Sequence, residues 1–221
     1  MGAGFYGKLP MRGDFIRRNL PADFVLPWDE WLMSVLQAGQ EGLGEAWLGR
    51  YLNSPIWRFV LGIGQCGSTG MVGVMIPSVD SVGRYFPLTV AAPIDGNALP
   101  ALSVLTAEAW YETAETVLLR ALEPETGFAD FDAAVAGLPP PPKAAGTGGA
   151  GRFTVTANAA GLAASLLRLA ADPESGRTSL WWTDGTPDLP GVSLCAAGLP
   201  SAEQGVALFD GQWERWGWTR R

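Results

Sequence analysis

The segment PIWRFVLGIGQCGSTGMVGVMIP, residues 55–77, holds two apolar runs that lie between two prolines. The runs occupy residues 56–64 and 71–76, and glycine, serine and threonine lie between them. Runs of this length with such flanks suit strands better than helices, and continuous hydrophobicity is typical of strands covered on both faces. We therefore predict two neighbouring buried strands.

Helical and strand patterns continue on both sides of this segment. Apolar residues recur at helical spacing from Trp28 to Leu36, and again over about 101–122, which predicts an inward-facing helix at each place. Pro124 ends the second helix, because proline lacks the amide hydrogen that a helix needs. Further strands are predicted at residues 88–93, 152–156, 178–183 and 191–196, and shorter helices around Phe131 and at 162–169.

The order of these elements predicts the fold class. Strands and helices alternate, which favours a layered α/β domain. Some strand pairs leave no room for a crossover and require antiparallel neighbours, so we expect a mixed central sheet. A Pro/Gly-rich segment interrupts the pattern at about 137–151. Because the roughly seventy residues after it are too few for a core of their own, we predict a single domain, 1–221, with this segment as a surface excursion.

Composition limits the class of function. The 221 residues are 48% hydrophobic, enough for a sizeable core, and the formal net charge is -7. An acidic chain is poorly suited to a phosphate backbone or an anionic membrane, so we expect no nucleic-acid partner and no membrane insertion. The N-terminal residues lack a secretory signal pattern, and no apolar run approaches the roughly twenty residues of a transmembrane helix. We therefore expect a cytoplasmic protein.

Signals for an enzyme are weak. Residues 62–67 spell G-x-G-x-x-G, but a dinucleotide site needs a helix at those glycines, and another strand-like run follows instead, which predicts a hairpin loop. The chain has no histidine, so imidazole-based nucleophile activation and metal ligation are excluded, and Cys66 and Cys195 lack zinc-site spacing. We expect no metal, no cofactor and no enzymatic activity. The alternative is a small-ligand- or nucleotide-binding enzyme that uses the Gly62–Gly67 loop and Asp80.

Two segments combine glycine, proline, aromatic residues and single charges, at residues 4–15 and 77–88. This composition indicates specified turns, because glycine and proline each require a particular backbone geometry. In the second segment, Asp80 and Arg84 are four residues apart and are placed to pair across the turn. At the end of the first segment and just after it, Arg12, Arg17 and Arg18 cluster around Phe15, a composition enriched at protein interfaces. The same residues also fit a purely structural ion pair and a plain solvated face.

The C-terminal residues 213–221 form another aromatic and basic cluster. We expect its rings to fold back onto the body of the domain, because rings left exposed would make an adhesive patch. Such a patch would mark a partner site or a solubility liability.

Several segments together resemble a known family. GFYGKLP at residues 4–10 with RGDFIRR at 12–18, PWDEWL at 27–32, SPIWRFVL at 54–61 and residues 77–88 are similar, in this order, to the blocks of the type VI secretion-associated TagF proteins. The resemblance is dense over roughly the first ninety residues and looser beyond them.

This resemblance implies a single three-layer α/β/α sandwich and a non-enzymatic role as a posttranslational repressor of type VI secretion. The resemblance also implies that the protein acts by holding a cytosolic scaffold protein with a forkhead-associated (FHA) domain, so an FHA-domain scaffold is the expected partner. We expect Arg12, Arg17, Arg18 and Arg84 to contribute to the binding surface. The full set of candidate partner-binding or motif residues is Arg12, Gly13, Asp14, Phe15, Arg17, Arg18, Asp80, Gly83 and Arg84.

Overall fold

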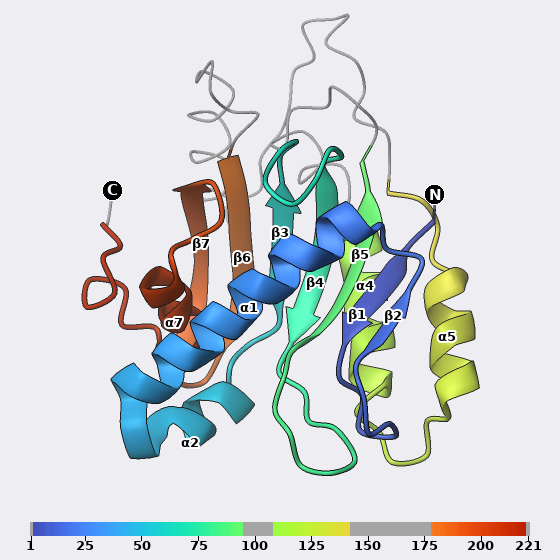
Figure 1. The fold of residues 1–221 in the computed structure, drawn as a ribbon, viewed down its shortest axis with the longest axis horizontal. Coiled ribbons are helices and arrows are strands. Elements are labelled where there is room, and N and C mark those ends of the chain that lie inside the picture. The colour runs from blue at the N-terminus through green and yellow to red at the C-terminus, as the bar shows by residue number, and fades with distance from the viewer. Residues whose placement is uncertain (1, 95–107, 142–177, 220–221) are drawn as a thin grey trace, which may run out of the picture.

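A computed structural model of the chain describes residues 2–94, 108–141 and 178–219 (Figure 1). The strands in these ranges form one seven-stranded sheet, in the order β2-β1-β5-β4-β3-β6-β7. Helices lie in front of the sheet and behind it (Figure 1). The chain therefore has an α/β fold, as predicted.

The centre of the sheet is formed by the segment that contains the two apolar runs. Strand β4 (Met71–Ile76) lies between β3 (Trp57–Leu61) and β5 (Leu88–Pro93), and every residue of β3 and β4 is buried. The prediction of two neighbouring covered strands is thus confirmed. The outer strands are β1 (Gly4–Gly7) and β2 (Ile16–Arg18) beyond β5, and β6 (Thr178–Thr186) and β7 (Leu189–Ala197) beyond β3.

Each face of the sheet has a hydrophobic core of its own. One core contains side chains of α4 (Glu108–Arg120) and α5 (Phe128–Ala136), and the other contains side chains of α1 (Ala22–Leu43), α2 (Trp47–Leu52) and α7 (Ala202–Asp210). The short helix η1 (Gly44–Ala46) joins α1 to α2. Successive strand residues alternate between the cores, because side chains along a strand point to opposite faces. The predicted inward stripe of α1 is buried: Trp28, Trp31, Leu32, Val35 and Leu36.

The expectation of a mixed sheet is wrong for the described strands, because all six pairings among them are antiparallel. The described residues between β5 and β6 form α4 and α5, and the seven-residue turn 121–127 between these helices makes them antiparallel neighbours. Strand β6 pairs antiparallel with β3, and β4 pairs antiparallel with both β3 and β5, so β6 runs opposite to β5.

Several predicted elements lie wholly or partly outside the described residues. These are the strand at 152–156, the helix at 162–169, the part of the helix at 101–122 before Glu108, and the Pro/Gly-rich segment from residue 142 onward.

Candidate partner-binding site

Asp80 is the centre of a buried polar network at one end of the sheet. Its Oδ2 atom accepts a hydrogen bond from Lys8 Nζ at 2.7 Å and one from Arg84 Nε at 2.7 Å. Its Oδ1 atom accepts from the backbone N–H groups of Val82 at 3.0 Å and Arg84 at 2.9 Å. The side chains of Asp80 and Lys8 are 0% and 4% exposed, so this carboxylate is enclosed and both of its oxygens have partners.

The network keeps Asp80 ionised. Burial alone would raise the pKa of the Asp80 carboxyl, but the hydrogen bonds from Lys8 and Arg84 outweigh burial and lower the pKa below its ordinary value. A carboxylate held in this state is badly placed to exchange protons near neutral pH. The structure shows the predicted pairing of Asp80 with Arg84. The enclosed position of Asp80 suits a structural ion pair better than acid-base chemistry.

This network joins two loops, residues 8–15 after β1 and residues 77–87 between β4 and β5, which we call the loop pair. The N–H of Ser81 donates to the carbonyl of Arg12 at 3.0 Å. Arg84 Nη2 donates to the carbonyl of Gly13 and lies 3.6 Å from Asp14 Oδ1. Both loops lie at the same end of the sheet, the lower end in Figure 1.

A second anchor fastens the loop of residues 77–87 to α2. The hydroxyl of Tyr51 donates to the carbonyl of Ser78 at 2.8 Å and accepts from the N–H of Ser78 at 2.9 Å. The Ser78 hydroxyl in turn donates to the carbonyl of Lys8 at 2.8 Å. Tyr51 therefore holds the loop pair to α2 through Ser78, two residues before Asp80.

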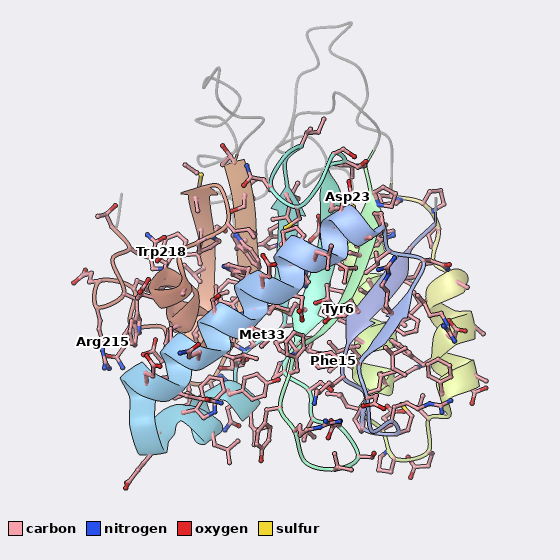
Figure 2. All side chains as sticks on the ribbon, viewed as in Figure 1. Tyr6, Phe15, Asp23, Met33, Arg215 and Trp218 are labelled. Atoms are coloured by element: carbon pink, nitrogen blue, oxygen red, sulfur yellow. The ribbon has the colours of Figure 1, made fainter. Side chains whose placement is uncertain are left out.

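An aromatic cluster borders the loop pair on the α1 face. The ring of Phe15 stacks on Tyr6 with centroids 5.9 Å apart and meets the edge of Phe86 at 4.7 Å. Lys8 Nζ lies 4.9 Å from the centroid of Phe15. Tyr6 donates to Asp29 Oδ1 of α1 at 2.5 Å, and burial together with this bond raises the pKa of Tyr6. Phe15 is nevertheless 47% exposed, and Figure 2 shows it next to Tyr6.

The predicted arginines do not lie on one face. Arg12 stacks on the ring of Phe128 at 4.4 Å, and Arg18 lies 5.7 Å from the same ring, so both reach toward α5. Arg17 adjoins Arg18 in β2 and therefore points to the opposite face, where its Nε donates to the carbonyl of Leu20 at 3.1 Å. Arg84 belongs to the loop pair.

The other predicted motif residues do meet. Gly13 and Asp14 contact Arg84, and the N–H of Gly83 donates to the carbonyl of Asp80 at 3.0 Å. The backbone φ of Gly83 is 87°, a conformation that favours glycine, so this residue closes the turn around Asp80. Phe15 borders the same cluster.

The residues that sequence reasoning missed are Lys8, Tyr51 and Ser78. Lys8 lies 72 residues from its partner Asp80, so no local pattern connects them. One signal was available: Lys8 is the first charge in the apolar segment GFYGKLP, where a lysine must be either exposed or paired.

The G-x-G-x-x-G segment is a hairpin loop, as predicted. It joins the antiparallel strands β3 and β4, and the N–H of Gly64 donates to the carbonyl of Gly67 at 2.9 Å. Gly64 and Gly67 have φ values of 84° and 91°, so the glycines serve the turn. Cys66 within the loop is buried, which raises the pKa of its thiol to about 12.

The loop 62–70 and Asp80 flank opposite ends of β4 and so do not converge on one site. Within residues 2–94, 108–141 and 178–219, no cluster of three or more Cys, Asp or Glu is suited to hold a metal ion. No helix in the same ranges combines the length and hydrophobicity needed to cross a membrane.

Comparison with known proteins places the chain in a family. Residues 4–138, which include the whole loop pair, match the family model for the TagF N-terminal domain, described as type VI secretion system-associated. The chain belongs to the TagF family. A crystal structure of PA0076 from Pseudomonas aeruginosa PAO1 is similar along nearly the full length: 41% identity, a TM-score of 0.80, and coverage of 96% of this chain and 95% of that chain. No curated protein matches the chain. TagF membership associates the chain with type VI secretion.

Proposed function

We propose that this chain is a non-enzymatic, posttranslational repressor of type VI secretion that acts in the cytoplasm by binding and sequestering an FHA-domain scaffold protein. Membership of the TagF family supports the setting in secretion. The observation that carries the mode of action is the saturated Asp80 carboxylate. Its hydrogen bonds to Lys8 and Arg84 hold two surface loops in one shape and leave no oxygen of Asp80 for chemistry.

Sequestration requires no bond to be made or broken. A repressor that binds one state of a scaffold shifts the scaffold toward that state by its difference in affinity for the two states. A surface that is ordered before binding loses less conformational entropy in the complex. The loop pair meets this condition, because Tyr51 fastens it to α2 and Asp80 ties its two loops together.

The test combines binding with secretion. Purified protein is mixed with the purified FHA-domain scaffold and the complex is measured by calorimetry, while effector release is followed in cells that lack or overproduce the protein. We expect a saturable complex, more release on deletion and less on overproduction, with unchanged transcript levels of the secretion genes. Unchanged release in both strains, or the absence of a complex, would contradict the proposal.

The alternative of a nucleotide-binding enzyme has its own check. A specific ligand stabilises a native state by mass action, so thermal shift against nucleotides reports it directly. We expect no shift, because the loop 62–70 begins no helix and lies away from Asp80. A saturable shift that Asp80→Asn abolishes would favour the enzyme.

A further inference from the structure

The two most exposed large hydrophobic side chains of the loop pair are those of Val82 and Phe15. Val82 at the tip of the loop 77–87 is 67% exposed, and Phe15 is 47% exposed. We infer that Phe15 and Val82 form the apolar centre of the docking surface for the scaffold, and that the partner offers an apolar patch rimmed by carboxylates. This inference rests on the proposed function and assigns its contact surface.

The first support is the rigidity of the backbone that carries these side chains. The N–H of Val82 donates to the buried Asp80 carboxylate at 3.0 Å. The ring of Phe15 is held between Tyr6 and Phe86. Exposed apolar groups with fixed positions lose little freedom on binding, and clustered aromatic and arginine side chains are typical of the residues that dominate interface energies.

The second support is charge. The loop pair contains three basic residues and two acidic ones, and Arg17 and Arg18 follow it in β2, in a chain whose net charge is -7. The exposed guanidinium groups of Arg12 and Arg84 belong to this basic region. An acidic partner would be attracted to this end of the sheet and repelled by the rest of the chain, which orients the encounter.

The opposite end of the sheet provides a matched comparison. Ile63, in the hairpin loop between β3 and β4, is 45% exposed, close to the value for Phe15. Its loop, residues 62–70, contains no charged residue. Both ends therefore expose at least one large hydrophobic side chain to a similar fraction, but of these two regions only the loop pair contains basic residues.

The experiment measures the dissociation constant for the purified FHA-domain scaffold with the full chain and five variants. Phe15→Ala removes the stacked ring, and Val82→Asp places a carboxylate where we expect an acidic partner. Ile63→Ala and Ile63→Asp are the controls. We expect the first two to weaken binding by about 10-fold or more and the controls by less than about 2-fold. Raising the salt concentration should weaken the wild-type complex, and Arg12→Glu should make that dependence shallower.

The outcomes separate this inference from the proposed function. Melting temperatures identify a variant that loses binding by unfolding. If Phe15→Ala unfolds, Val82→Asp still tests the surface, because Val82 is 67% exposed and its substitution should leave the fold intact. If the wild type binds and both loop-pair variants bind equally well, the docking surface is wrong and the proposed function stands. Equal losses in the Ile63 variants also overturn it. A wild type that does not bind overturns the proposed function, and this inference with it.

Discussion

At the scale of single residues, Lys8 supplies the enclosed positive charge that faces Asp80 in the loop pair. Its ammonium is 2.7 Å from Asp80, and both side chains are almost fully enclosed. Breaking a buried pair by removing one member is costly, because the remaining charge stays buried with fewer partners. Arg84 still pairs with Asp80 in that case, but its own side chain is 54% exposed and cannot replace the enclosed contact.

We predict that Lys8→Met lowers the melting temperature by on the order of 10 °C. Methionine keeps most of the volume and removes the charge, so calorimetry would report the lost ion pair. The double variant Lys8→Met with Asp80→Asn should recover part of the loss, since neither charge remains. A shift below about 2 °C for the single variant would show that Arg84 alone supports Asp80.

The pH dependence of stability follows from the same carboxylate. The pKa of Asp80 is lower in the folded state than in the unfolded chain, where it is about 4. Its contribution is therefore complete above about pH 5 and is lost as the pH falls through the unfolded value toward the folded one. We predict that the urea concentration at the midpoint of unfolding decreases once the pH is below about 4.5, and that Asp80→Asn makes this decrease smaller. If the urea midpoint of the wild type and that of Asp80→Asn depend on pH in the same way, the lowered pKa of Asp80 is contradicted.

At the scale of elements, the C-terminal segment fastens the end of α1 to α7. Trp216 Nε1 donates to both oxygens of Asp210, at 3.1 and 2.9 Å, and Arg215 Nη2 donates to the carbonyl of Gly42 at 2.9 Å. The rings of Trp213, Trp216 and Trp218 are partly buried, so they fold back onto the domain as predicted. Figure 2 shows Trp218 and Arg215 on the side of the molecule that carries α7.

The substitution Gly42→Ala tests the contact between Trp216 and α1, because the sign of the change in melting temperature depends on that contact. A Cβ atom at Gly42 would lie 2.5 Å from the ring of Trp216, so Gly42→Ala should lower the melting temperature of the full chain. In a Trp216→Ala background the clash is absent. There Gly42→Ala should raise the melting temperature by about 2 °C, because alanine has a better helix propensity than glycine. The same sign in both backgrounds would mean that Trp216 does not pack on this helix.

At the scale of the whole molecule, the two cores enclose ionisable groups in neutral form. Burial raises the pKa of Tyr6, Tyr51 and Tyr111, and the three tyrosines lie in cores on both faces of the sheet. The folded chain keeps these protons, whereas the unfolded chain releases them near pH 10. Stability from this source is present below about pH 10 and is lost as the pH rises above it.

We predict that the phenolate absorbance of these tyrosines appears together with the loss of near-ultraviolet circular dichroism, since ionisation requires unfolding. Recording both signals during an alkaline titration is the measurement. Ionisation of all three near pH 10 with the tertiary signal intact would show that the phenols reach solvent in the native state.

Local pattern was enough to predict much of this fold. The two central strands, the buried stripe of α1 and the hairpin at residues 62–67 each follow from neighbours in the sequence: continuous hydrophobicity, helical spacing and glycine placement. The family followed from ordered motifs. The direction of the strands did not, because it depends on which strands become neighbours in the folded sheet, and several of these are far apart in the sequence.

The sequence predicted the contacts of the candidate site that lie within one turn, but not those between distant segments. Asp80 and Arg84 meet within one turn, but Lys8 reaches Asp80 only because β1 pairs with β5 in the folded sheet. Arg17 and Arg18 adjoin in sequence and part in space, because successive side chains of a strand point to opposite faces. The sequence by itself determined which turns and strands form, and the tertiary structure alone decided which of their charges are neighbours.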